Sequence, residues 1–151
     1  MNRMLLFSIL LFAAGFALGS EPASTAGADG DAGLSESRLN AAEQRLATIT
    51  DPAARLYFTA GTEWAKGEPE KALQILSESI VHHAYDEKWI AKSELLSARL
   101  YVELGMLDAA DVTARQVQAL YEGSEVAEKA TALRIEVEQL KKETEAKRST
   151  K

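Results

Sequence analysis

The chain has 151 residues, enough for one domain of ordinary size, and 46% of them are hydrophobic, so it can build a packed core. Only 7% are aromatic and none is cysteine, which excludes disulfides, thiolate metal sites and cysteine catalysis. The 17 basic and 23 acidic residues give a net charge of −6, which argues against binding nucleic acid through its phosphates. Alanine and leucine carry most of the apolar content, which favours packed helices over a β-sheet.

The first 20 residues have the pattern of an export signal. Arg3 lies in a short basic segment, an apolar run follows over 4–18, and Ala17 and Gly19 are small residues of the kind that signal peptidase requires. The run is shorter than the roughly 20 residues that span a bilayer. We therefore predict a signal peptide over 1–20, no stable membrane span after cleavage, and export to the periplasm, with secretion as the alternative. An uncleaved membrane anchor is the other interpretation of this run.

Residues 21–34 are mostly small and polar, with three glycines, and are predicted to form a flexible linker. Helical periodicity follows, and we predict a helical domain over 35–148. Its first stretch, 35–50, has one apolar stripe, formed by Leu39, Ala42, Leu46 and Ile49.

Aspartate, proline and glycine divide the remainder into further helices. Asp51-Pro52 is typical of a helix start, with aspartate as N-cap and proline at the first position. Asp86 and Ser124 are expected N-caps, and Gly67 and Gly105 are placed to end helices in the left-handed conformation. No stretch shows strand alternation long enough to compete, so the predicted fold class is all-α. The predicted helices cover 53–66, 70–81, 87–104, 107–121 and 125–146.

Gly67 and Gly105, which are 38 residues apart, lie in segments that repeat. An alanine lies seven residues before each glycine and five residues after it: Ala60 and Ala72 in the first segment, Ala98 and Ala110 in the second. Small residues let two helices approach closely, and glycine permits the turn between them. Because a two-helix unit cannot bury its apolar face alone, we expect the two units to stack.

This pattern resembles the tetratricopeptide repeat (TPR) family over roughly residues 53–124, and the long period is similar to that of exported cell-envelope members. Tyr101 matches the family's tyrosine. The chain departs from the pattern at Glu63, which replaces the tyrosine of the first repeat, and in its period of 38 instead of about 34. The resemblance implies a short α-solenoid of two TPR-like helical hairpins, at about 53–86 and 91–124, with a flanking N-terminal helix and a C-terminal capping helix. An unrelated helical bundle is the alternative.

By the same resemblance, a peptide or protein partner would bind the inner face of the first helix of each unit. The matching positions are Tyr57, Gly61 and Trp64 in the first unit and Lys92, Leu95, Arg99 and Glu103 in the second. Aromatic and arginine side chains are frequent anchors at interfaces. Packing between helices is the alternative role for Tyr57 and Trp64. The lysine–asparagine clamp with which some relatives hold a C-terminal carboxylate is not matched.

The sequence contains no pattern typical of catalysis. The one cluster of metal-ligand residue types is His82-His83 with Asp86 and Glu87, but adjacent residues on a helix point about 100° apart. We therefore interpret the histidines as a solvated helix end and predict no metal site. A phosphate-binding glycine loop and a nucleophile elbow are both absent from the sequence. We predict that the protein is not an enzyme and has no cofactor.

These observations predict a non-enzymatic exported adaptor that binds a protein or peptide partner in the cell envelope. The first alternative is a structural, self-associating envelope protein, since apolar residues over 126–140 follow heptad spacing. That stripe is too short to hold a coiled coil alone, so we expect it to pack on the helix at 107–121, giving a monomer or weak homodimer. An enzyme or a metal binder is the least favoured alternative. The basic tail over 141–151 is interpreted as a solvated helix end.

Overall fold

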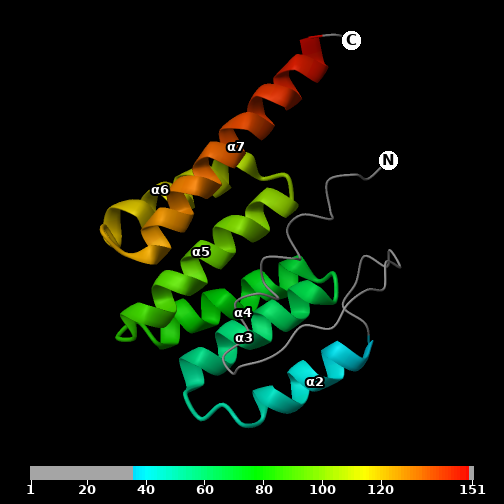
Figure 1. Ribbon diagram of the computed structural model, residues 1–151, viewed down its shortest axis with the longest axis vertical. Coiled ribbons are helices and arrows are strands. Elements are labelled where there is room, and N and C mark those ends of the chain that lie inside the picture. The colour runs from blue at the N-terminus through cyan, green and yellow to red at the C-terminus, as the bar shows by residue number, and fades with distance from the viewer. Residues whose placement is uncertain (1–35, 150–151) are drawn as a thin grey trace, which may run out of the picture.

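The computed structural model describes residues 36–149, and this part of the chain is helical throughout, without strands (Figure 1). Its six helices are α2 (Glu36–Leu46), α3 (Pro52–Ala65), α4 (Pro69–His82), α5 (Glu87–Glu103), α6 (Leu107–Leu120) and α7 (Glu125–Ser149). The predicted all-α class is confirmed for these residues. The predicted signal peptide over 1–20 and linker over 21–34 lie outside the described residues.

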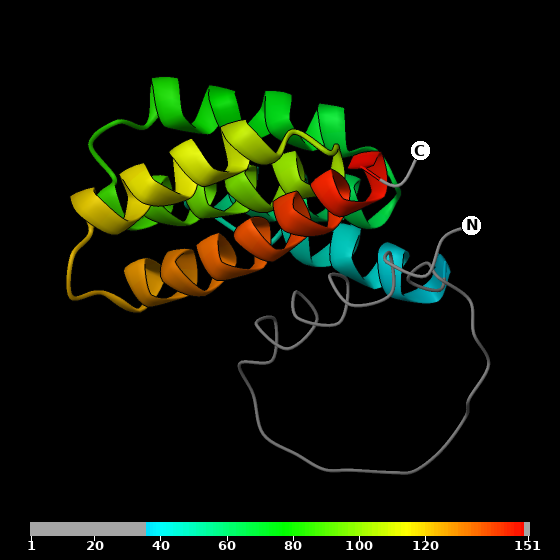
Figure 2. The ribbon, with the colours of Figure 1, turned by 90° about the horizontal axis from the view of Figure 1, so that it is seen from above.

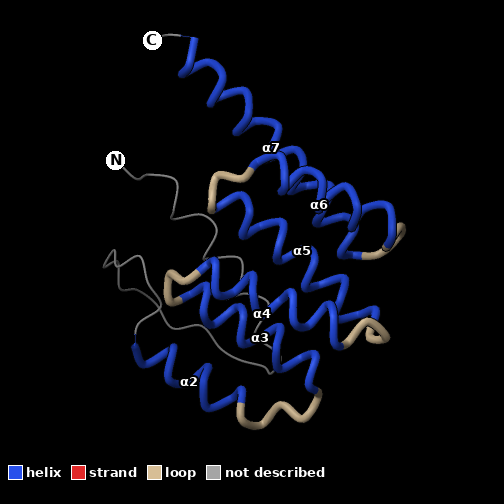
Figure 3. Tube along the Cα trace, turned by 180° about the vertical axis from the view of Figure 1, so that it is seen from behind, coloured by secondary structure: helices blue, strands red, loops and turns tan. Residues whose placement is uncertain are grey.

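Each helix packs against the next one along the chain, and α5 also contacts α3 and α7. From α2 to α7 the helices follow one another across the molecule, joined by short loops (Figure 3). Seen from above, α4 lies along one side of the molecule and α7 along the opposite side (Figure 2). Since α5 touches α3, α4, α6 and α7, it is the central helix of the fold.

Side-chain N-caps begin three of the helices where the sequence predicts them. One carboxylate oxygen of Asp51 accepts the backbone N–H of Ala53 at 2.9 Å at the start of α3. Asp86 and Ser124 each accept the backbone N–H three residues further on, at 3.3 and 3.2 Å. Each cap satisfies a backbone donor that has no partner within its own helix, so these residues fix the starts of α3, α5 and α7.

Gly67 and Gly105 end α3 and α5 in the same way, with φ angles of 84° and 72°. The residue after each glycine donates its backbone N–H to the carbonyl four residues before the glycine. These bonds run from Glu68 to Glu63 at 3.0 Å and from Met106 to Tyr101 at 2.8 Å. Such a bond belongs to the Schellman motif, in which the glycine takes the left-handed conformation. The predicted equivalence of the two turns is confirmed.

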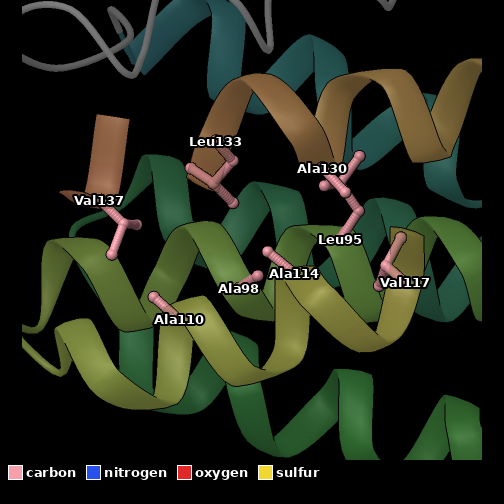
Figure 4. Packing of buried hydrophobic residues seen from close by; sticks show 8 residues of the cluster. All are labelled: Leu95, Ala98, Ala110, Ala114, Val117, Ala130, Leu133 and Val137. Atoms are coloured by element: carbon pink, nitrogen blue, oxygen red, sulfur yellow. The ribbon is translucent and has the colours of Figure 1, made fainter. Parts of the chain in front are cut away.

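Three hydrophobic clusters lie within the described residues, and the two larger ones contain the four alanines predicted to be buried, Ala60, Ala72, Ala98 and Ala110, which are all 0% exposed. The first cluster joins α3, α4 and α5 and consists of Ala60, Trp64, Ala72, Leu76, Leu96 and Leu100. The second joins α5, α6 and α7 and consists of Leu95, Ala98, Ala110, Ala114, Val117, Ala130, Leu133 and Val137 (Figure 4). Because α5 supplies residues to both of these clusters, it connects them.

The two terminal helices differ from their predicted extents. α2 ends at Leu46, so Ile49 does not continue its apolar stripe and packs instead beside Ala53 and Trp89. The hydroxyl of Thr48 donates to the carbonyl of Arg45 at 2.8 Å within the turn that ends α2. The prediction that this stripe reaches Ile49 is therefore wrong.

The last helix packs on α6 as predicted, through the apolar residues of the second cluster. It continues to Ser149, three residues past the predicted end, and its C-terminal part extends beyond the other helices (Figure 1). After Val137 its residues are exposed or only partly buried. None of the helices between residues 36 and 149 is long and apolar enough to cross a bilayer.

Candidate partner-binding site

The predicted site residues come from α3 and α5, two helices that contact each other. Four of these residues interact across this contact: Tyr57 with Arg99, and Trp64 with Glu103. Tyr57 and Arg99 are both partly buried. Burial raises the pKa of Tyr57, and the positive charge of Arg99 opposes that rise, so the two side chains lie within electrostatic range. Nearer the end of α3, the indole N–H of Trp64 donates to the carboxylate of Glu103. The bond from Trp64 to Glu103 thus joins α3 directly to α5.

Three of the predicted residues lie in the interior. Trp64 is 6% exposed and belongs to the first cluster, while Leu95 is 8% exposed and belongs to the second. Gly61 is buried within α3. The alternative interpretation of Trp64 as a packing residue agrees with this placement. Of the predicted set, four residues have side chains that reach the surface: Tyr57, Lys92, Arg99 and Glu103.

An aromatic cluster that the sequence prediction missed lies next to Tyr57. The ring centroids of Tyr57, Phe58 and Trp89 are 5.3 to 5.5 Å apart in all three pairs. Such separations and tilted or edge arrangements are typical of favourable aromatic contacts. Trp89 is 9% exposed and comes from the first turns of α5, so the cluster spans both helices. Its signal in the sequence was a tryptophan three residues after the predicted N-cap Asp86.

Asp51 fixes the position of this cluster. Its second carboxylate oxygen accepts the indole N–H of Trp89 at 2.8 Å, while the first caps α3. Burial alone would raise the pKa of Asp51, but the hydrogen bonds from Ala54, Trp89 and Ala53 outweigh it and lower the pKa. One ionised carboxylate therefore starts α3 and orients an aromatic ring of α5.

The start of α5 also carries two lysines over the indole of Trp89. The ammonium nitrogens of Lys88 and Lys92 lie 5.2 and 4.5 Å from the ring centroid, within the range of cation–π attraction. The pKa of Lys92 is lowered, first by burial and then by the charges of Lys88 and Lys129, whereas Glu125 opposes this shift. The junction therefore has a largely buried aromatic cluster with two lysines over its tryptophan.

The structure provides no metal centre among the residues that it describes: between 36 and 149 no three His, Asp or Glu side chains gather closely enough to hold an ion. His82 is exposed, and the imidazole Nδ1 of His83 lies 3.3 Å from the hydroxyl of Tyr85. Comparisons with models of known protein families, with curated proteins and with solved structures return no match. The candidate site is therefore described from the geometry of this chain alone.

Proposed function

We propose that this protein is a non-enzymatic adaptor that binds a protein or peptide partner at the junction of α3 and α5. The observation that carries the proposal is the aromatic cluster of Tyr57, Phe58 and Trp89, which lies beside the cationic groups of Lys92 and Arg99. Tyrosine, tryptophan and arginine are the residues that most often dominate binding at protein interfaces. A rigid pair of helices presents them, so little side-chain freedom is lost on binding.

The proposal includes the arrangement of the helices as a short TPR-like solenoid. The matching turns at Gly67 and Gly105 and the four buried alanines support two equivalent units, α3–α4 and α5–α6. In this arrangement α7 is the capping helix, and the face shared by α3 and α5 is the binding surface. Successive first helices add up to a continuous surface in solenoids, which is why residues of α3 and α5 would serve one partner.

The location of the adaptor in the cell envelope, with the periplasm preferred, rests on the export pattern over 1–20. N-terminal sequencing of protein from the native host tests this part. A mature chain that starts after Gly19 or Ser20 agrees with export by a cleaved signal. A chain that still starts at Met1 contradicts it and points to a membrane-anchored protein.

Chemical crosslinking in the native envelope, followed by capture of the chain, tests the binding function. We expect a partner to be captured by the wild-type chain and to be lost or strongly reduced with Arg99→Ala. Helicity and melting temperature should change little, because Arg99 is only partly buried. Arg148→Ala is the matched control, since that arginine is exposed near the end of α7.

A different result would show that the partner binds α7. If Arg99→Ala leaves capture intact while charge reversals on α7 abolish it, the junction of α3 and α5 is not the binding surface. Sedimentation over a range of concentrations tests the self-associating alternative, because a structural homodimer would persist without any partner.

A further inference from the structure

We propose that the start of α5 binds an acidic segment of a peptide partner, with Lys88 and Lys92 as the contacting cations and Trp89 as the platform beneath them. The inference rests on the proposed function and names the chemistry of the partner. It adds Lys88 and Trp89 to the surface and makes charge, in addition to aromatic contact, the source of specificity.

The charges around Lys92 are unbalanced. The charges that shift the pKa of Lys92 are those of two cations, Lys88 and Lys129, which lower it, and that of the Glu125 carboxylate, which raises it. Glu125 is already engaged, because its carboxylate lies 2.7 Å from the ammonium of Lys129 on the next turn of α7. Between residues 36 and 149, no ion pair is formed by Lys88 or Lys92. A chain of net charge −6 thus keeps two neighbouring lysines without a carboxylate partner among the described residues.

Helix stability does not explain these lysines. Like charges four residues apart on a helix repel each other, and Lys88 and Lys92 have this spacing. Lys88 also lies in the first turn of α5, where the helix dipole disfavours a cation. Burial adds to the cost of charging Lys92. The indole of Trp89 offsets part of this repulsion, and an anionic ligand would offset the rest.

The surroundings favour a narrow acidic peptide over an anionic membrane. Carboxylates flank the lysines along the chain and in space: Asp51 bonds Trp89, Asp86 caps α5, and Glu125 lies beside Lys129. A flat anionic surface would bring its charges against these carboxylates as well as against the lysines. An extended peptide can place one or two side chains on the lysines and remain clear of the flanking groups.

Fluorescence anisotropy of a labelled hexaglutamate peptide, blocked at both ends, tests the proposal with the purified chain. We expect binding that weakens as salt rises, because exposed charges are screened beyond about 10 Å at 0.1 M ionic strength. Replacing both lysines, Lys88→Gln with Lys92→Gln, should weaken binding on the order of tenfold. The matched control is Lys71→Gln with Lys142→Gln, which removes the same charge from exposed positions on α4 and α7.

Thermal melting separates binding from packing. If the lysines serve the ligand, their replacement leaves the melting temperature unchanged or raises it, since a repulsion is removed. If they only pack on Trp89, the melting temperature falls while peptide affinity stays the same, which would overturn the proposal. Equal weakening by the control pair would also overturn it, because binding would then follow net charge alone.

Two further results bear on the inference separately from the proposed function. If phosphatidylglycerol vesicles, and not the peptide, bind in a manner that depends on Lys88 and Lys92, the acidic peptide is the wrong ligand. If a native partner is captured through Arg99 but its capture does not change with Lys88→Gln and Lys92→Gln, this inference fails and the adaptor function stands. If hexaglutamate binds through the lysines but no native partner is captured, the anion site stands and the adaptor function fails.

Discussion

The α3–α4 and α5–α6 units have the same turn and the same buried alanines, but different residues stand at the position four before the turning glycine. In the first unit this residue is Glu63, and in the second it is Tyr101. Both carbonyls accept the same backbone bond that closes the turn. The backbone frame therefore does not depend on this side chain.

The side chains of Glu63 and Tyr101 instead make different contacts with the neighbouring helices. The carboxylate of Glu63 lies 3.0 Å from Lys66 and 2.7 Å from Lys71, and Lys66 in turn reaches Glu43 of α2 at 2.7 Å. Tyr101 packs against the second cluster, which α7 helps to form. The first unit is thus joined to α2 through charges, whereas the second is joined to α7 through apolar contacts.

This difference explains the unequal ends of the molecule. No residue of α2 is buried, but four residues of α7 are: Ala127, Ala130, Leu133 and Val137. Apolar burial contributes more to stability than exposed ion pairs do, so α7 should be the firmly held end and α2 the weakly held one. The buried alanines and the left-handed glycine determine the geometry of each pair of helices. The residues around them determine which further helix packs on that pair.

The largest loss of stability is expected from a cavity in α5, the helix that contributes to both of the larger clusters. Leu100 of α5 is fully buried in the first cluster, so Leu100→Ala should lower the free energy of unfolding by about 2–5 kcal/mol. Denaturant unfolding should remain a single transition, because α5 belongs to both clusters. Leu120→Ala is the control, since that leucine is 61% exposed and its loss should cost little. Two separate transitions would show that the units are independent.

Enlarging the small residues tests the equivalence of the units. Ala60→Leu and Ala98→Leu place a large side chain where exposure is 0%, and each should cost about 1–3 kcal/mol in thermal or denaturant unfolding. Ala132→Leu, on the exposed side of α7, is the control and should have little effect. A loss confined to one unit would mean that the two alanines are not equivalent.

The turning glycines should give a smaller but equal effect. A Cβ at Gly67 or Gly105 would meet nothing within 4 Å, so Gly→Ala at either position introduces only backbone strain. We expect a loss of about 1–2 kcal/mol at each glycine. Gly105→Asn should cost less, because asparagine tolerates the left-handed conformation. An unchanged stability in Gly67→Ala would contradict the common turn geometry.

The smallest expected effect is on the acid dependence of stability, and it tests the ion pairs of Glu63 beside α2. The hydrogen bond from Lys71, followed by the interactions with Lys66, lowers the pKa of Glu63 below its ordinary value of 4.5. A depressed pKa in the folded state contributes stability above about pH 4.5, and this contribution is lost as the pH falls through the folded pKa. Glu63→Gln should remove that part of the acid dependence, worth under about 1 kcal/mol near neutral pH. Tyr101→Phe is the matched control and should leave the acid dependence unchanged.

The fold was predictable from sequence where single residues determine local backbone geometry. Asp51, Asp86 and Ser124 set helix starts, and Gly67 and Gly105 set helix ends, because capping and left-handed turns depend on residue type. The end of α2 was not predictable, since apolar periodicity continued to Ile49 while tertiary contacts with Trp89 drew that residue away.

The candidate site was predictable only in part. Tyr57 and Arg99 could be named from their repeat positions, but Trp64 and Leu95 at similar positions turned inward. The bond from Trp89 to Asp51 joins residues 38 positions apart, and no local pattern encodes it. Long-range pairing, which depends on how the units pack, therefore decides which side chains remain at the surface.

Site-specific photocrosslinking in the native host tests the central claim most directly. A photoreactive phenylalanine analogue at position 99 should crosslink a partner protein, whereas the same analogue at position 112 should not. Val112 is 61% exposed on α6, so the second position is accessible but lies outside the proposed surface. Crosslinking to one protein from position 99 alone would agree with an adaptor that binds at the α3–α5 junction. A partner that crosslinks from position 112 and not from position 99 would contradict it.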